Sequence, residues 1–222
     1  MSFFKKGDGG LDHIAARTVS MLADARHSFD LASAAVLSGA DAAGIGADVR
    51  ATDERINQAE QDLRRELVVH VAVQGSDDIG EVLGYTLLIK KIERIGDQAK
   101  NILDLADEEV DFSGAPDQEE MLGVSRTISN MMGEASDLLA EVNPERAADF
   151  RIRTDALRLD LEDHIREFMH SDAPGRESVP RAILYRYWKR IVANLSGVVT
   201  TVTEPLQHQD YHDHGETDID DD

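Results

Sequence analysis

The sequence predicts an all-α fold of six helices, and three features of its 222 residues support this class. Apolar residues recur three and four positions apart along six long stretches, which is the period of one face of a helix. No stretch alternates between apolar and polar residues as a half-buried strand would. Gly, Pro and acidic residues gather between the stretches, where turns are expected.

The first half of the chain contains three of these stretches. We expect a first helix over residues 11–37, a second over 47–73 and a third over 78–109. Each carries a stripe of aliphatic residues, which predicts a buried face. In the third helix this stripe consists of Tyr85, Leu88, Ile89, Ile92, Ile95, Gly96, Ala99, Ile102, Leu103 and Ala106.

The second half repeats this organisation after a connector at residues 111–116. Helices are predicted over residues 117–142 and 143–170, and a sixth follows the turn at 171–175 and runs to about 205. Residues 1–10 form an N-terminal extension. The acidic, histidine-containing tail at 206–222 has almost no apolar residues, so we expect it to be disordered.

Composition excludes several classes of function. The chain has no cysteine, which rules out disulfides and thiolate metal sites. Its formal net charge of −21 repels nucleic-acid phosphates, so we expect no direct nucleic-acid binding. The N-terminus lacks the apolar run of a secretory signal, which predicts a cytoplasmic protein. A Gly-rich phosphate loop, a nucleophile elbow and a His-Glu-x-x-His pair are absent, so we do not expect an enzyme.

Two carboxylates stand one helical turn apart beside the apolar stripe of the third predicted helix. Glu93 and Asp97 project along the same edge, together with Lys100 and Asp104. Like charges at this spacing repel each other by a few tenths of a kcal/mol when they are solvated. A solvated edge is therefore acceptable, and a hard cation held between the carboxylates would remove the repulsion.

The ten residues 93–102, Glu-Arg-Ile-Gly-Asp-Gln-Ala-Lys-Asn-Ile, resemble the signature helix of the PhoU family, with Gln98 in the place of a His. The resemblance implies two tandem three-helix repeats, at residues 11–110 and 117–205, that pack as one elongated six-helix bundle. It also implies metal ions bound on the bundle surface and a role in regulating phosphate uptake and the phosphate-starvation response.

The resemblance indicates where a metal would bind. The second helix of such a bundle runs beside the motif helix, so Asp53 and Asn57 are candidates to complete a site with Glu93 and Asp97. Oxygen ligands suit a divalent or trivalent ion such as iron, magnesium, manganese or zinc, whose identity the sequence leaves open.

The second repeat departs from the family pattern. Thr52-Asp53 corresponds to Thr154-Asp155, and at the same offset Glu60 corresponds to Glu162. Lys189 and Ala193, however, stand where the second motif would have its two carboxylates. We therefore expect a single metal site, and we expect Lys189 to pair with an acid such as Glu162.

We therefore expect a regulator of phosphate uptake and phosphate-starvation signalling that acts by metal-assisted protein interaction. By resemblance its partners are the phosphate ABC transporter or a phosphate permease and a membrane histidine kinase, with a possible homodimer. These partners would place it at the membrane periphery. Two alternatives stay open: an accessory protein of an ion-driven phosphate permease, and a non-catalytic helical scaffold whose Glu93 and Asp97 are only a solvated edge.

Overall fold

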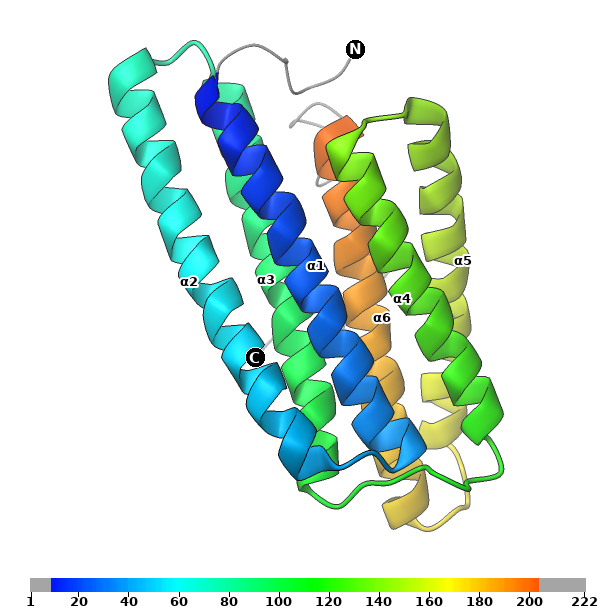
Figure 1. The fold of residues 1–222 in the computed structure, drawn as a ribbon. Coiled ribbons are helices and arrows are strands. Elements are labelled where there is room, and N and C mark those ends of the chain that lie inside the picture. Colours follow the sequence, from blue (N-terminus) through cyan, green and yellow to red (C-terminus); the bar gives the residue numbers. More distant parts are fainter. Residues whose placement is uncertain (1–8, 204–222) are drawn as a thin grey trace.

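The computed structural model describes residues 9–203, and all of its regular structure there is helical (Figure 1). The six helices are α1 (Gly9–Ser38), α2 (Ala42–Gln74), α3 (Ile79–Asp107), α4 (Gln118–Ala140), α5 (Pro144–Met169) and α6 (Gly175–Thr203). The predicted all-α class and helical bundle are confirmed. The predicted tail lies outside the described residues, as does most of the N-terminal extension.

Local chemistry explains where the helices begin and end. Gly39 adopts a positive φ of 61°, which stops α1. The side chain of Asp41 then accepts a hydrogen bond from the Ala43 backbone N–H and caps α2. Helix α2 therefore begins five residues earlier than predicted and includes Gly44 and Gly46. In the same way Asn143 accepts from the backbone of Arg146 at the start of α5, where a boundary was predicted.

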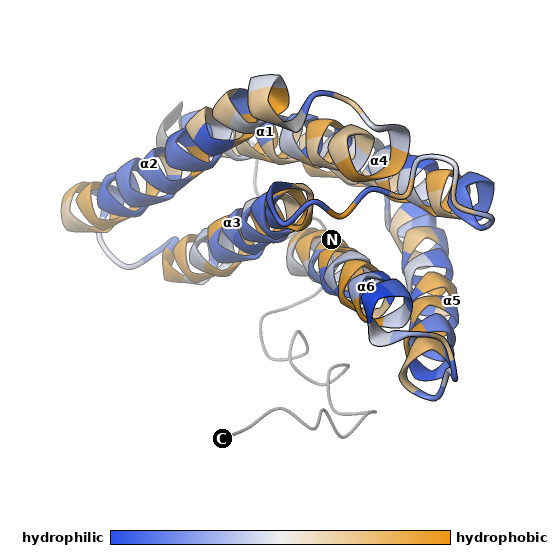
Figure 2. Ribbon diagram, turned by 90° about the horizontal axis from the view of Figure 1, so that it is seen from below, coloured by the Kyte–Doolittle hydropathy of each residue, from blue (hydrophilic) through white to orange (hydrophobic). Residues whose placement is uncertain are grey.

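The helices pack in two layers around a single core. Viewed from one end, α2, α1 and α4 form one layer, α3 and α6 form the other, and α5 lies beside α6 (Figure 2). Two seams join the halves of the chain: α3 packs on α6, and α1 packs on α4. The predicted boundaries of two repeats, at 11–110 and 117–205, stay a prediction.

Apolar side chains fill the space between the layers. Leu22 and Phe29 of α1, Ile92 of α3 and Trp188 of α6 are fully buried. Burial of such side chains is the main favourable term in folding. Several aliphatic residues nevertheless remain exposed near the α2–α3 turn, among them Val73 and Leu83. No helix among residues 9–203 is long and apolar enough to cross a membrane.

An aromatic cluster lies between α5 and α6. The imidazole of His164 stacks on Tyr185 with ring centroids 4.9 Å apart, and Trp188 contacts the same tyrosine. His164 Nε2 lies 2.9 Å from the Glu120 carboxylate, and Nδ1 lies 2.9 Å from the Asp160 carbonyl oxygen. Burial lowers the pKa of His164, but these two hydrogen bonds outweigh it and raise the pKa above its ordinary value.

Candidate functional site on helices α2 and α3

The close packing of α2 against α3 brings the motif carboxylates next to polar residues of the other helix. Gly96 of α3 faces Ile56 of α2 so closely that a Cβ atom on Gly96 would stand only 2.9 Å from Cδ1 of Ile56. Both residues are buried. The absence of a side chain at Gly96 therefore lets α2 lie directly on the motif helix.

Asp53, Asn57 and Asp97 form one end of the site. Asn57 Nδ2 donates to Asp53 Oδ2 at 3.3 Å, and Lys100 Nζ donates to the same oxygen at 3.4 Å. Burial raises the pKa of Asp97, and the negative charges of Glu93 and Asp53 raise it further, against the opposing effect of Lys100 and Lys90. Asp97 thus lies in the field of carboxylates from both helices.

Glu60, Glu93 and Lys90 form the other end. Glu93 is only 8% exposed, and Lys90 Nζ lies 2.7 Å from its Oε2 and 3.7 Å from Oε1 of Glu60. Arg64 also contacts Glu60, at 2.9 Å. The contact with Glu93 raises the pKa of Lys90, although desolvation opposes it. Glu60 Oε1 and Glu93 Oε2 are buried, and neither accepts a hydrogen bond of normal geometry. The neighbouring cations therefore stabilise these two oxygens mainly through charge.

The donor chemistry of this site suits a hard cation, because every candidate ligand atom is an oxygen and two of them lack a directed hydrogen bond. As the side chains stand, however, no three Asp, Glu or His residues within 9–203 are arranged to hold a metal ion. The ammonium groups of Lys90 and Lys100 lie against the carboxylates instead. A bound metal would have to compete with these lysines.

All four residues predicted for the site lie along this one seam. Glu93 and Asp97 come from α3, and Asp53 and Asn57 come from α2, as the sequence suggested. Sequence reasoning did not include Lys90 or Glu60 in the site. Their positions carried a signal, because Lys90 precedes Glu93 by one helical turn and Glu60 follows Asn57 by three residues.

The corresponding place in the second half contains a lysine–carboxylate pair. Lys189 Nζ donates to Glu162 Oε2 at 2.6 Å, and Lys189 is only 9% exposed. This hydrogen bond lowers the pKa of Glu162 below its ordinary value, and Arg166 and Arg186 act in the same direction while burial opposes them. The predicted pairing of Lys189 with Glu162 is confirmed. The lysine therefore supplies a fixed positive charge where the motif would place an acid.

Comparison with known proteins agrees with this architecture. Residues 18–106 match the family model described as the PhoU domain. The matched range includes every residue of the α2–α3 site. The fold matches the crystal structure of PhoU from Pseudomonas aeruginosa with a TM-score of 0.75 and 20% sequence identity, over 87% of this chain and 95% of that one. No curated protein matches the sequence. Residues 18–106 thus match the PhoU domain, and the six-helix bundle that contains them has the fold of the Pseudomonas aeruginosa PhoU structure.

Proposed function

We propose that this protein regulates phosphate uptake and phosphate-starvation signalling as a non-enzymatic, cytoplasmic protein. The observation that carries the proposal is the match of residues 18–106 to the PhoU domain, in which the motif residue Glu93 is buried and Asp97 is half-buried among charged side chains. Carboxylates held at such a cost in desolvation are more common at functional sites than on ordinary helix surfaces. Its partners would be a phosphate transporter and a membrane histidine kinase, which would bring it to the membrane periphery.

Deleting the gene in its host tests this regulatory function. Loss of the protein should increase labelled-phosphate uptake in phosphate-rich medium and activate a phosphate-starvation reporter. The wild-type gene should restore both to normal. A variant with Glu93→Gln and Asp97→Asn should fail to do so, whereas Glu54→Gln, an exposed substitution on α2, should behave as wild type. Uptake and reporter levels that do not change on deletion would refute the function.

The second part of the proposal is that a metal ion assists the interaction. Glu93 and Asp97, together with Asp53 and Asn57, would hold it. When bound, such an ion would neutralise the carboxylates and offer coordination positions to acidic or phosphate groups of a partner. Because Lys90 Nζ lies 2.7 Å from Glu93, the lysine and the metal would compete for the same oxygens. Metal binding would therefore depend on release of this ion pair.

This competition gives a direct test. Calorimetric titrations with Mg²⁺, Mn²⁺, Zn²⁺ and Fe³⁺ should use a chain whose tail histidines are replaced by asparagine, because imidazoles bind transition metals on their own. Glu93→Gln should abolish binding, and Lys90→Met should strengthen it. Lys91→Met is the control, since Lys91 neighbours Lys90 but belongs to no carboxylate pair of the site. If no ion binds even to Lys90→Met, the metal part of the proposal is wrong and the scaffold interpretation is favoured.

A further inference from the structure

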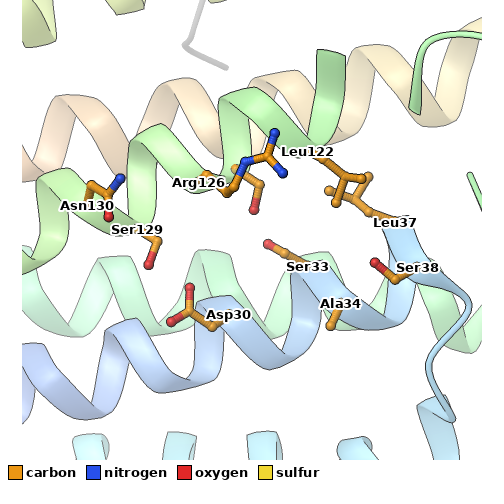
Figure 3. A pocket seen from close by; sticks show the side chains of 10 residues that line it. Asp30, Ser33, Ala34, Leu37, Ser38, Leu122, Arg126, Ser129 and Asn130 are labelled. Carbon is orange, nitrogen blue, oxygen red and sulfur yellow. The ribbon is translucent and has the colours of Figure 1, made fainter. Parts of the chain in front are cut away.

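A second polar site lies at the seam between α1 and α4. A cleft of about 310 Å³ opens there, and none of the carboxylates of the α2–α3 site lines it (Figure 3). Its lining is dominated by small polar side chains, and the residues are Asp30, Ser33, Ala34, Leu37, Ser38, Leu122, Ser125, Arg126, Ser129 and Asn130. One wall comes from each half of the chain.

The wall formed by α1 contains a buried hydroxyl group, that of Ser33, which has no hydrogen-bond partner among the described residues. Ser33 is only 4% exposed, and its Oγ has no hydrogen-bond partner. Most buried polar groups are paired, and an unpaired one costs about 1–3 kcal/mol. Figure 3 shows the Ser33 and Ser129 hydroxyls and the Asp30 carboxylate directed into the space between the two helices. A ligand in this space would provide the missing partner.

One arginine lines the cleft and a second lies next to it. Arg26, which is not part of the lining, donates from Nε to Ser129 Oγ at 3.1 Å, and the same Nε lies 4.0 Å from Oδ2 of Asp30. Arg126 lines the rim, and its surface pair with Glu119 is well exposed on both sides. Exposed pairs of this kind contribute little energy, so Arg126 is available to a ligand at small cost.

We propose that this cleft binds a phosphoryl group, either as inorganic phosphate or as part of a small phosphorylated metabolite. Arginine guanidinium groups and serine hydroxyls are donors suited to phosphate oxygens. Asp30 is an acceptor for the one protonated oxygen of hydrogen phosphate, and its charge would repel a sulfate ion, which has no such proton at neutral pH. The choice of phosphate as the physiological ligand rests on the proposed function, but the cleft itself is argued from its own residues.

Ligand binding in this cleft would stabilise the packing of α1 against α4. The cleft is lined by α1 of the first half and α4 of the second half, so a bound phosphoryl group would hydrogen-bond to both. A ligand that binds only the packed arrangement stabilises it in proportion to its concentration and affinity. The regulator would in this way sense phosphate directly, and the α1–α4 seam would be the sensing element.

Calorimetry on the full-length protein with inorganic phosphate, glycerol phosphate and sulfate at constant ionic strength tests the proposal. Inorganic phosphate should bind at least tenfold more tightly than sulfate, and Asp30→Asn should reduce this preference. Ser33→Ala should weaken binding by about tenfold or more, the effect of losing one hydrogen bond to a charged group. Arg126→Gln should weaken it too, while Arg65→Gln, an exposed paired arginine on α2, should not.

Thermal unfolding separates a binding role from a structural one. Without ligand, Ser33→Ala should raise the melting temperature, because the variant removes an unsatisfied buried hydroxyl and alanine favours the helix. With phosphate, the wild type should gain stability and Ser33→Ala should not. Tighter binding of glycerol phosphate than of inorganic phosphate would assign the cleft to a metabolite.

Absence of binding by both phosphoryl compounds at millimolar concentration, or equal binding by sulfate that Ser33→Ala leaves unchanged, would overturn the proposal. These failures are distinct from failure of the regulatory function. A gene deletion that alters phosphate uptake would still support regulation even if the cleft bound no phosphoryl group. Conversely, calorimetric binding that Ser33→Ala removes would keep the cleft as a phosphoryl site even if the deletion had no effect on uptake.

Discussion

Substitution of Gly96 by alanine measures how closely α2 approaches the motif helix. An alanine Cβ would stand 2.9 Å from Cδ1 and 3.4 Å from Cγ2 of Ile56, whereas carbon atoms pack best at about 3.5–4.0 Å. Ile56 is 1% exposed, so its side chain cannot turn into solvent and could move only within the packed core. Relief would require a strained rotamer or a separation of the two helices.

The expected magnitude combines two opposing terms. Replacing a mid-helix glycine by alanine stabilises a helix by about 1 kcal/mol. Overpacking a filled core costs about 1–3 kcal/mol. Gly96→Ala should therefore change the free energy of unfolding by between about zero and 2 kcal/mol in the destabilising direction. Gly123→Ala on α4 is the matched control, because a Cβ there would meet nothing within 4 Å, and it should stabilise by about 1 kcal/mol.

Urea unfolding followed by far-ultraviolet circular dichroism measures both variants. The two should differ by about 1–3 kcal/mol, which corresponds to roughly 2–12 °C in melting temperature for a chain of this size. Adding Ile56→Val, which removes Cδ1, should cost less in Gly96→Ala than in wild type. If Gly96→Ala stabilised the protein as much as Gly123→Ala, or if the two substitutions were additive, the argument from close helix approach would be refuted.

Three further outcomes are expected. Glu162→Ala removes the carboxylate that accepts a hydrogen bond from the buried Lys189 and should lower the free energy of unfolding by about 1–3 kcal/mol in urea titrations. A second substitution, Lys189→Met, should restore part of this stability. The pKa of His164 is raised in the folded state, so protonated His164 stabilises the fold. This stabilisation is fully present below the ordinary pKa of 6.5 and is lost as pH rises through the folded-state pKa. Wild type should therefore exceed His164→Gln in stability by more at about pH 5.5 than at about pH 8.5, and an equal difference at both would contradict the assignment. Leu22→Ala should cost about 2–5 kcal/mol in the core, whereas Leu83→Ala, at a position 51% exposed, should stay within about 0.5 kcal/mol in the same denaturation assay.

The helices and the resemblance to the PhoU family were accessible from the sequence because both depend on local order, whereas the metal role of the four candidate residues stays a prediction. Apolar spacing fixed which face of each helix is buried, and the residues 93–102 carried the resemblance that the PhoU domain match confirms. Asp53 and Asn57 were found through the expected neighbour relation of two consecutive helices. The start of α2 was missed, because a cap by Asp41 outweighed the glycines that suggested a longer turn.

The tertiary structure decided what those residues meet. Lys90 lies near both Glu60 and Glu93 because α2 and α3 pack in one particular register, in which Gly96 lies against Ile56. The unsatisfied hydroxyl of Ser33 and its cleft exist because α1 and α4 pack with small side chains between them, although contacting residues such as Arg26 and Ser129 are 103 positions apart in the chain. The spacing of apolar residues in a sequence predicts which face of a single helix is buried. A binding site between two helices also depends on how their faces are placed relative to each other, which only the tertiary structure determines.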